Sequence, residues 1–436
     1  MQNMHIRNLG PVKECKFDVN GFTILTGAQA SGKSTLAKAI YFFRTLKTDV
    51  YEEITRRPSE EDYYTGMING LEKRIRNKFL RIFGSSWSME NTMKMVYSYT
   101  PRMSVEIYLE PDRNNLYRNF VKTTIGDPLR ELLKRYENSV GDDYIWDQEE
   151  QREKLRKEIQ AVFNDEYEIV YIPAGRSLTT VLTDQLAAMM DADVRALDYC
   201  MRSYIRLTLS LRLPLRDGTS GMLKEKLHTT QDKVPHEALK ALQDRMDEVL
   251  CGQYVYDRGE ERLRLKGDSH KYVKINYASS GQQETVWIFN LLYYYILERK
   301  KVLLIVEEPD AHLFPEAQKK IAEALGIFGN AGNGVFVTTH SPYILGAFNN
   351  LLYASSVSKE IMERLSFCMD TFLSRKRTSV WHIYAGKLQN GLYEGFIQNE
   401  LIDGASDQIN SELDMMMEAH WTNEERRDGH ECTKHE

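Results

Sequence analysis

Residues 27–35 read GAQASGKST and form the most specific motif of the chain. It fits the pattern G-x-x-x-x-G-K-[ST], in which glycines let the backbone turn its N–H groups onto phosphate oxygens. A short strand-like run at 22–25 precedes it, and a helical pattern from about 34 to 46 follows it. A phosphate-binding loop needs a strand before it and a helix N-terminus after it, and both are predicted here.

We expect this loop to bind the phosphates of ATP together with Mg²⁺. Lys33 is predicted to reach the β- and γ-phosphates, and Ser34 to be a ligand of the magnesium ion. The alternative, a glycine-rich turn arising by chance, does not account for the flanking strand and helix. The predicted phosphate-binding residues of the loop are Gly27, Ser31, Gly32, Lys33, Ser34 and Thr35.

Two continuous apolar runs, 302–306 and 335–339, are rich in β-branched residues. Such runs are typical of strands that are buried on both faces of a parallel sheet. A helix is predicted over 315–325 between them, with Pro315 at its first position. This strand–helix–strand order predicts an α/β protein.

The first of these strands ends in EEPD, residues 307–310. Carboxylates at a strand end beside a phosphate-binding loop are expected to lie near the magnesium ion and the γ-phosphate. Glu307 is predicted to act on the magnesium ion, and Glu308 to polarise the attacking water as a general base. The competing interpretation is an acidic helix cap, because Asp310 precedes a turn.

Residues 278–284 read ASSGQQE and resemble the ABC signature motif, Leu-Ser-Gly-Gly-Gln, in the form found in SMC, RecF and OLD-type ATPases. Ser279, Gly281 and Gln282 match that motif, whereas Ala278 and Ser280 depart from its usual form. The resemblance implies that these three residues contact the γ-phosphate of ATP held by a second protomer. It therefore implies that catalysis needs a dimer.

Two further stretches resemble the same group. EEPDAHL at 307–313 resembles the Walker B motif and D-loop of OLD-like ATPases, and TTHSP at 338–342 resembles the switch-histidine motif. The resemblance implies that His340 senses the γ-phosphate and helps to position the attacking water. A lone histidine is usually structural, but here four motifs stand in the order of the family. The loop YIPAGR at 171–176 also resembles one in the OLD-like group, which makes Arg176 a weaker candidate near the site.

The resemblance implies an ABC-type P-loop ATPase head, with a mixed sheet and flanking helices, interrupted by a helical insertion between the Walker A loop and the signature. No sustained heptad occurs in that interval, so the long coiled coil of SMC proteins is not expected. The predicted divisions are the N-terminal part of the head at 1–46, an insertion of mixed helix and strand at 47–165, a helical arm with a hairpin at 166–269, the C-terminal part of the head at 270–420 and a disordered tail at 421–436. Within them, alternating residues predict strands near 95–99 and 105–109 and a hairpin over 253–265, and a buried helix is predicted from about 282 to 299.

Composition indicates a globular cytoplasmic protein without a membrane segment. Hydrophobic residues make up 42% and charged residues 28% of the chain, and no apolar run reaches the length of a transmembrane helix. The five cysteines are scattered without a C-x-x-C pair, which fits a reducing compartment. The net charge of −6 gives no overall attraction to nucleic acid. Basic clusters at 73–81 and 375–377 leave nucleic-acid binding open, with a solvated helix face as the alternative.

OLD-family nucleases carry a Toprim domain after the ATPase, with an Asp-x-Asp at a strand end. The Asp-x-Asp at 191–193 lies before the signature, in a helical and methionine-rich stretch, which is the wrong place for that domain. The layout therefore resembles the stand-alone ATPase subunits of two-gene anti-phage systems such as PARIS and Septu. This resemblance implies a homodimer, or a larger oligomer of dimers, that controls a separate nuclease or toxin.

Two other functions remain open. A RecF-like repair ATPase would bind DNA through Arg74, Arg76 and Lys78. The chain could also be the ATPase subunit of a transporter, although the form of the signature and the large insertion speak against that.

Overall fold

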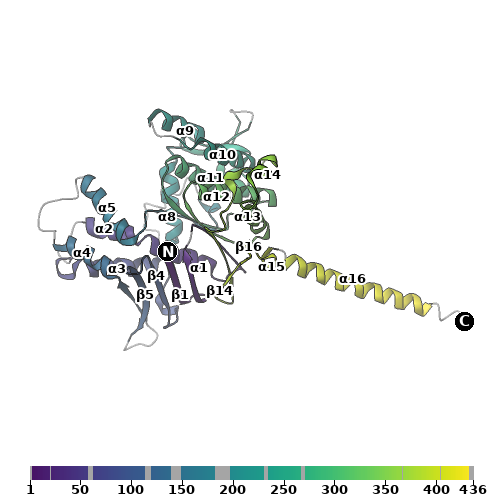
Figure 1. Cartoon of the computed structure of the whole chain (residues 1–436), viewed down its shortest axis with the longest axis horizontal. Coiled ribbons are helices and arrows are strands. Elements are labelled where there is room, and N and C mark those ends of the chain that lie inside the picture. The colour runs from purple at the N-terminus through teal and green to yellow at the C-terminus, as the bar shows by residue number, and fades with distance from the viewer. Residues whose placement is uncertain are drawn as a thin grey trace.

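A mixed sheet of eleven strands forms the centre of the protein in a computed structural model. The structure describes residues 2–19, 21–56, 62–112, 119–138, 149–181, 197–229, 234–266, 271–365, 367–402 and 404–431. From one edge to the other, the sheet contains β6 (Asn119–Ile125), β5 (Ser104–Pro111), β4 (Lys94–Ser98), β1 (Gln2–Leu9), β2 (Val12–Val19), β14 (Lys387–Asn390), β13 (Thr378–Tyr384), β3 (Phe22–Gly27), β12 (Gly334–Thr339), β11 (Val302–Glu307) and β7 (Glu168–Ile172). Helices flank it on both faces (Figure 1), as the predicted α/β class requires.

The remaining elements surround this sheet. The helices are α1 (Lys33–Arg44), α2 (Leu46–Thr55), α3 (Asp62–Phe83), α4 (Asp127–Asn138), α5 (Glu149–Phe163), α6 (Ser177–Val181), α8 (Tyr199–Leu211), α9 (Gly218–Thr229), α10 (His236–Leu250), α11 (Ser280–Leu297), α12 (Pro315–Asn330), α13 (Pro342–Ala354), α14 (Lys359–Arg364), α15 (Asn399–Ile402) and α16 (Gly404–Glu431). Two small sheets contain β8 (Gly252–Asp257), β9 (Glu260–Leu265) and β10 (Tyr272–Lys274), and β15 (Leu392–Tyr393) and β16 (Phe396–Ile397).

The sheet has a parallel half and an antiparallel half. Strands β13, β3, β12, β11 and β7 pair in parallel. Strands β3, β11 and β12 are buried along their whole length. β11 and β12 confirm the strands expected from the two apolar runs, and β3 confirms the strand expected before the phosphate-binding loop. The carboxyl ends of parallel strands lie at one edge of a sheet. This edge therefore brings together the phosphate-binding loop, the acidic end of β11 and the loop after β12.

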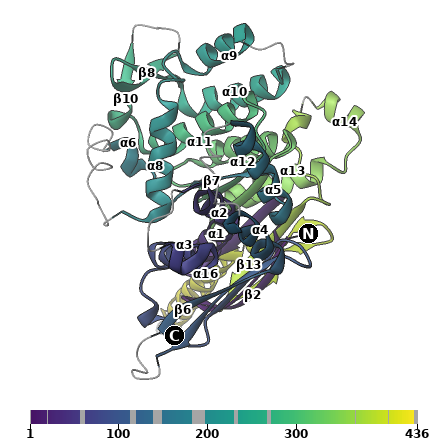
Figure 2. The same cartoon turned by 90° about the vertical axis from the view of Figure 1, so that its left-hand side faces the viewer.

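The two faces of the parallel half are covered by different helices (Figures 1 and 2). Leu25 and Ile305 belong to a core that includes α1, α2 and α3. Ile24 and Leu304, one residue earlier on the same strands, belong to a second core with α10, α11, α12 and α13. Because successive side chains of a strand point to opposite faces, each strand contributes to both cores.

The segment 47–165, predicted as an insertion, contributes strands to the same sheet as β1. Strands β4 and β5 confirm the strands predicted near 95–99 and 105–109, and β4 pairs directly with β1, opposite Met4 and Ile6. Strand β6, which the sequence did not predict, extends the same sheet. Strand β7, assigned from sequence to the helical arm, also lies in this sheet, beside β11. The large sheet thus contains strands from the segments 1–46, 47–165, 166–269 and 270–420.

The helical arm packs on the face of the sheet that α11 and α12 cover. Helix α10 contacts both of these helices, and α9 contacts α11. The hairpin predicted over 253–265 is present as β8 and β9, with Arg258 and Gly259 at its tip. Both tip residues have positive φ, 50° and 84°, as a tight two-residue turn between antiparallel strands requires.

Helix α16 overlaps the tail that is predicted from residue 421. The helix continues to Glu431, and residues 432–436 lie outside the described part of the chain. Most residues between 405 and 427 are moderate to good helix formers, among them Glu, Met, Arg and Ala, which accounts for the helix. It extends away from the body of the molecule (Figure 1), and its exposed residues include Ile409, Leu413 and Met416. None of the described helices is long and apolar enough to cross a membrane.

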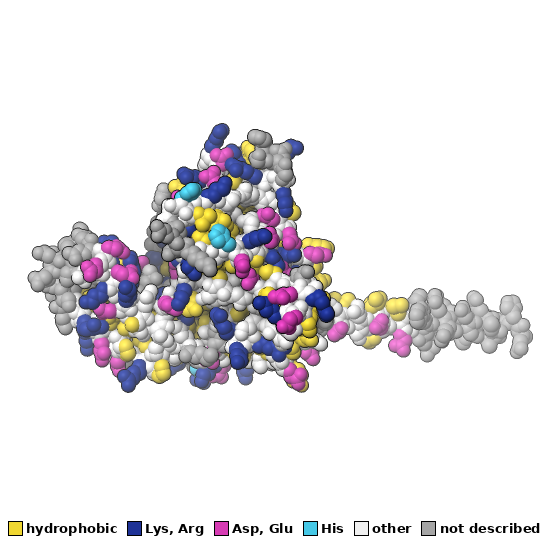
Figure 3. Space-filling view, turned by 45° about the horizontal axis from the view of Figure 1, so that its top comes forward, with side chains coloured by type: hydrophobic (Ala, Val, Ile, Leu, Met, Phe, Trp, Pro, Cys, Tyr) yellow, Lys and Arg dark blue, Asp and Glu magenta, His cyan; other side chains and the backbone are white. Residues whose placement is uncertain are grey.

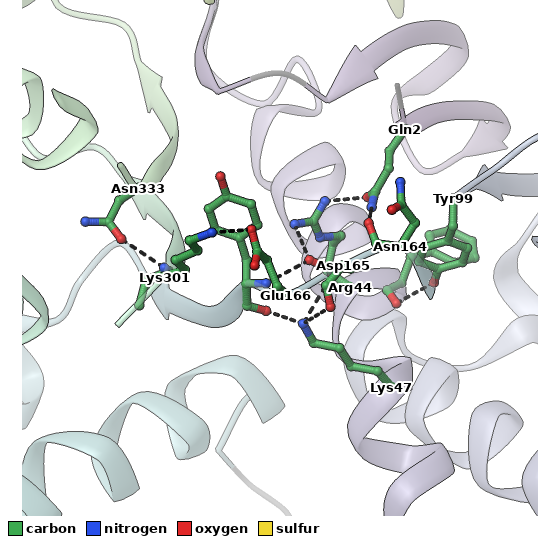
Figure 4. Close-up of polar contacts among 12 residues, drawn as sticks. Gln2, Arg44, Lys47, Tyr99, Asn164, Asp165, Glu166, Lys301 and Asn333 are labelled. Carbon is green, nitrogen blue, oxygen red and sulfur yellow. Dashed lines mark hydrogen bonds and ion pairs between the residues drawn. The ribbon is translucent and has the colours of Figure 1, made fainter. Parts of the chain in front are cut away.

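A buried ionic network anchors α1 at the end opposite the phosphate-binding loop (Figure 4). Arg44 at the last turn of α1 donates to Asp165 Oδ1 at 3.0 Å, and Lys47 Nζ lies 3.2 Å from Asp165 Oδ2. The hydroxyl of Tyr99 donates to the carbonyl of Phe43 at 2.6 Å. These contacts tie α1 to β4 and to the segment before β7. The C-terminal end of α1 is therefore fixed, while its N-terminal end follows the phosphate-binding loop.

Candidate functional site

The phosphate-binding loop between β3 and α1 has a backbone that only glycine can adopt at two positions. Gly27 has a φ of 153° and Gly32 a φ of 109°, both in the left-handed range. A Cβ at Gly27 would lie 2.5 Å from Ile383 Cγ2, and one at Gly32 would lie 2.8 Å from Val12 Cγ2. Both glycines are therefore required by conformation and by space.

Lys33 is held over this loop. Only 6% of it is exposed, and its ammonium group donates to the carbonyl oxygens of Gly27 and Ala28, at 2.8 Å each. Burial lowers the pKa of Lys33, and the carboxylates that follow β11 oppose that shift. The loop also holds the buried hydroxyl of Ser31, which has no hydrogen-bond partner among the described residues. A cation and a free hydroxyl within a glycine-lined loop are suited to an anion.

Glu307 is the buried carboxylate of the site. It is 4% exposed, and its Oε2 accepts a hydrogen bond from the backbone N–H of Ala174 at 3.3 Å. Its Oε1 is buried without a hydrogen-bond partner in the described part of the chain. Burial and the nearby Glu307 carboxylate raise the pKa of the Tyr171 phenol. A free carboxylate oxygen beside a phosphate-binding loop fits a hard divalent cation or its bound water.

Glu308, the next residue, has the opposite environment. Its backbone has a φ of 43°, which is uncommon for a residue with a side chain and is associated with functional sites. The N–H of Glu308 donates to Thr338 O at 2.9 Å, so the turn is fixed to β12. The Glu308 side chain is 33% exposed, and His340 Nδ1 lies 3.5 Å from its Oε1. Glu308, unlike Glu307, is thus accessible to a water molecule.

Asp310 joins the loops after β11 and β12, which the sequence did not predict. It is 5% exposed, and its Oδ1 accepts a hydrogen bond from the hydroxyl of Thr339 at 2.7 Å. The N–H of Ser341 donates to that same hydroxyl oxygen at 3.0 Å. Burial raises the pKa of the Asp310 carboxyl, and the Thr339 hydrogen bond opposes the shift. The network fixes the backbone on both sides of His340.

The signature residues form the start of α11, two residues earlier than predicted. Ser279 caps the helix: its Oγ accepts from the N–H of Gln282 at 3.3 Å, and Gln282 Oε1 accepts from the N–H of Ser279 at 3.0 Å. The Gln282 amide also donates to Leu250 O at 2.7 Å. Gln282 therefore shapes the helix start through contacts within the chain, while Ser279 is exposed.

Gly281 places this helix start against the loop that follows β11. A Cβ at Gly281 would lie 3.0 Å from His312 O and 3.1 Å from Leu313 Cδ2. Two aromatic side chains, Tyr277 and Phe314, are 77% and 76% exposed in these same segments. The structure thus gathers Lys33, Glu307, Glu308 and His340 at the ends of neighbouring strands. It places Ser279, Gly281 and Gln282 on a separate helix that reaches them through residues 312–313.

Arg176, the weakest candidate from sequence, lies beneath the acidic strand end. It is fully buried, and its guanidinium donates to the carbonyl oxygens of Glu307 at 2.7 Å and Glu308 at 3.0 Å. Its position follows from β7, which runs parallel to β11 and ends beside it. The only signal for it in the sequence was the loop at 171–176.

The basic cluster at 73–81 is partly engaged within the chain. Arg74 bonds to Glu52 at 2.6 Å and to Glu53 at 3.4 Å, and the buried Lys78 bonds to Asp49 at 2.5 Å. Arg76 is exposed. On the face drawn in Figure 3, basic and acidic side chains are interspersed. Two of the three basic residues proposed for DNA contact thus have carboxylate partners.

Comparison with known proteins gives one family and a set of structural likenesses. A family model described as an AAA ATPase domain matches residues 1–345. The chain is similar to the SMC head domain from Thermotoga maritima, with 13% identity and a TM-score of 0.34 over 79% of this chain and 90% of that one. It is also similar to the Smc head domain with an extended coiled coil bound to the C-terminal domain of ScpA, from Pyrococcus furiosus. That likeness has 12% identity and a TM-score of 0.38 over 89% of this chain and 96% of that one. No curated protein matches.

Proposed function

The chain belongs to the AAA ATPase domain family, and on that premise we propose that it is an ATP-dependent dimerisation switch that controls a separate effector protein. ATPase activity follows from the family. We further propose that the protein forms a dimer, that single residues have the roles given below and that an effector protein is controlled.

The observation that carries the proposal is the exposed start of α11. Ser279 caps this helix and is exposed, and Gly281 packs against the loop that follows β11. The N–H groups at a helix N-terminus bind anions, and the helix dipole favours negative charge there. A phosphate held by the loop of a second copy is the ligand that this helix start would bind. Two copies would then share two nucleotides.

The residues at the strand ends fit Mg²⁺-ATP. The loop around Lys33 suits the phosphates, and Ser34 with the free Oε1 of Glu307 would hold the magnesium ion. The metal supplies charge neutralisation on the phosphate oxygens when it is bound. Glu308, exposed beside His340, would accept a proton from the attacking water, and His340 would orient that water.

The energetic logic of the switch follows from shared binding. If each γ-phosphate is bound by Lys33 of one copy and Ser279 of the other, its release removes contacts that exist only in the closed dimer. A ligand shifts an equilibrium only by its differential affinity for the two states. Loss of the γ-phosphate would therefore favour the open state.

A separate effector is supported by the organisation of the chain. The Asp-x-Asp at 191–193 lies outside the described residues, and it precedes the signature in sequence. A nuclease or toxin encoded separately, as in two-gene anti-phage systems, fits this layout. The helical arm and α16 offer surfaces for such a partner.

The test is to capture partners of the Glu308→Gln protein from its native host in the presence of ATP. The Glu308→Gln substitution is expected to retain ATP and hold the closed state. Mass spectrometry should find a nuclease-like or toxin-like protein in stoichiometric amount, and the double variant with Lys33→Ala should not recover it. Recovery of nucleic acid with repair proteins alone would contradict the effector proposal and favour a RecF-like function.

A further inference from the structure

We propose that Arg176 is a positioning residue that couples the signature end of α11 to the acidic end of β11, so that each ATP site responds to engagement of the other. The inference rests on the ATP-dependent dimer of the proposed function. It adds a physical link within one chain between the residues that would meet two different nucleotides.

The side chain of Arg176 connects three segments that are far apart in sequence. Its Nε donates to the backbone carbonyl of Glu284 at 2.8 Å and lies 3.1 Å from Glu284 Oε2. Its Nη1 donates to Pro173 O at 3.1 Å and to Glu307 O at 2.7 Å, and its Nη2 donates to Glu308 O at 3.0 Å. One planar group thus holds α11, the loop after β7 and the end of β11 in a single arrangement.

This arrangement requires an arginine. Arg176 is 0% exposed, and the carboxylate of Glu284 beside it is 1% exposed. A buried cation needs a charge partner and full hydrogen bonding. Four of the five N–H donors of the guanidinium have acceptors here. A lysine ammonium has three donors at one point and cannot reproduce a planar fork that reaches three segments.

The link joins groups that belong to different nucleotide sites. Ser279 and Glu284 lie on the same helix, one turn and a half apart, and Ser279 would meet the phosphate of the second copy. Arg176 donates to the carbonyl of Glu284 and to the carbonyls of Glu307 and Glu308. The side chains of Glu307 and Glu308 would act on the nucleotide bound by their own copy. A shift of α11 on engagement would therefore move the backbone turn that carries the Glu308 carboxylate.

A second contact joins the same two segments. The N–H of Ser177 donates to Glu284 Oε1 at 3.3 Å, so both the side chain and the backbone after Arg176 follow the helix. The turn at Glu308 has a φ of 43°, a conformation that persists in a residue with a side chain only when the surrounding structure holds it. By linkage, if a phosphate bound at the signature strengthens nucleotide binding beside the acidic pair, nucleotide bound there strengthens binding at the signature by the same factor.

The test compares Arg176→Lys with wild type in steady-state ATP hydrolysis. We expect kcat to fall ~10-fold, which corresponds to loss of hydrogen bonds to a charged group worth ~1.4 kcal/mol. KM should stay within about twofold, because the groups that touch the phosphates remain. The Hill coefficient, at most about two for two sites, should fall to about one. That last change is the readout that a merely structural role would not produce.

A second substitution protects the test against misfolding of Arg176→Lys. Glu284→Gln keeps the length of the side chain and the backbone carbonyl that accepts from Arg176 Nε, but removes the charge. It should lower the Hill coefficient in the same direction. The double variant should be no worse than Arg176→Lys alone, because both changes break one link. Additive losses of kcat would overturn the coupling.

Arg44→Lys is the matched control. Arg44 is also a buried arginine in an ion pair, with Asp165, but at the far end of α1. The Arg44→Lys substitution should lower the thermal stability of the protein, and the variant should keep the same Hill coefficient as wild type. If Arg176→Lys keeps that Hill coefficient as well, Arg176 is only a local support and the coupling is wrong. If wild type itself forms no dimer with ATP, the proposed function fails, and the coupling fails with it.

Discussion

His340 and Glu308 face each other from the ends of two neighbouring parallel strands, with Nδ1 of His340 3.5 Å from Oε1 of Glu308. That separation is longer than a good hydrogen bond. Catalytic hydrogen bonds are often long before substrate binds and shorten in the reactive complex. Both side chains are partly exposed, unlike the buried Glu307 behind them. The pair is thus placed where an attacking water could lie between a carboxylate and an imidazole.

Glu308→Gln should abolish turnover without abolishing ATP binding. The amide keeps the size of the side chain but cannot accept a proton from water, and a positioned general base contributes ~10²–10⁴-fold. We therefore expect kcat to fall at least ~100-fold, and the dimer to accumulate on size-exclusion chromatography with Mg²⁺-ATP. Glu307→Gln should instead raise the Mg²⁺ concentration needed for half-maximal hydrolysis, because it removes a carboxylate that is proposed to hold the ion. A Glu308→Gln protein that hydrolyses ATP like wild type would assign the base to another residue.

Lys33→Ala should remove the stabilisation that Mg²⁺-ATP gives to the folded protein. A ligand at ~100 times its Kd stabilises by ~2.7 kcal/mol, and Lys33 is the cation of the loop. We expect the rise in melting temperature with Mg²⁺-ATP to disappear in this variant.

Lys78→Ala is the control for that experiment, because Lys78 and Lys33 are equally buried, at 6% exposure each. Lys78 is paired with Asp49, so its loss leaves a buried carboxylate and should cost ~3–5 kcal/mol. The melting temperature should fall, yet the rise with Mg²⁺-ATP should persist. If both variants lose the rise in melting temperature with Mg²⁺-ATP, the loss comes from general destabilisation and not from the missing Lys33 ammonium group.

Gly281→Ala tests the contact between the signature and the loop after β11. The new Cβ would lie 3.0 Å from His312 O, so the helix start or the loop must move by a few tenths of an ångström. We expect a stability change within ~1 kcal/mol but a fall in ATPase activity of ~10-fold or more, because Ser279 moves with the helix. Parallel assays of unfolding and hydrolysis separate the two effects.

Gly346→Ala is its matched control on α13. The nearest atom to a Cβ there is Ile402 Cγ2, at an ordinary 3.8 Å. Replacing an interior helical glycine with alanine should stabilise the protein by ~0.5–1 kcal/mol and leave ATP hydrolysis unchanged. If both variants lose activity alike, the contact between Gly281 and His312 has no special role.

The sequence predicted the elements whose causes are local. The phosphate-binding loop, the strands at 302–306 and 335–339 and the helix that opens at Pro315 each depend on neighbouring residues, and the structure has them at those places. Alternation at 95–99 indicated one buried face, but not which strand lies beside it. Strand β4 pairs with β1, which lies far away in the sequence, and a single sequence does not reveal which strands pair.

Arg176 shows the same limit within the site. Its acceptors are mainly backbone carbonyls, and those of Glu284 and Glu307 are 108 and 131 residues away along the chain. A carbonyl carries no sequence signature, so no motif identifies an arginine that binds it. Asp310 is similar: its partner Thr339 lies on another strand, and the bond appears only when β11 and β12 are side by side. Residues that touch phosphate have recognisable spacing, whereas residues that hold the site together do not.

Asp310→Asn should make the folded protein less sensitive to rising pH. Burial raises the pKa of Asp310 above its ordinary value of 3.8 in the folded state. A carboxyl with a raised folded pKa contributes stability below its unfolded pKa, and that contribution is lost as pH rises through the folded pKa. Asparagine does not titrate, and its amide oxygen can still accept from Thr339. The free energy of unfolding of Asp310→Asn, relative to wild type, should therefore increase as pH rises from about 4 toward 8.

Thr339→Val checks the cause of that pH dependence. The Thr339 hydroxyl donates to Asp310 at 2.7 Å and lowers its pKa, so it favours the ionised form against burial. Without it, the folded pKa should rise further, and the loss of stability with rising pH should extend to higher pH than in wild type. Urea unfolding of the three proteins across this pH range gives both comparisons. A stability difference between wild type and Asp310→Asn that shrinks as pH rises would mean that hydrogen bonding, not burial, dominates at Asp310.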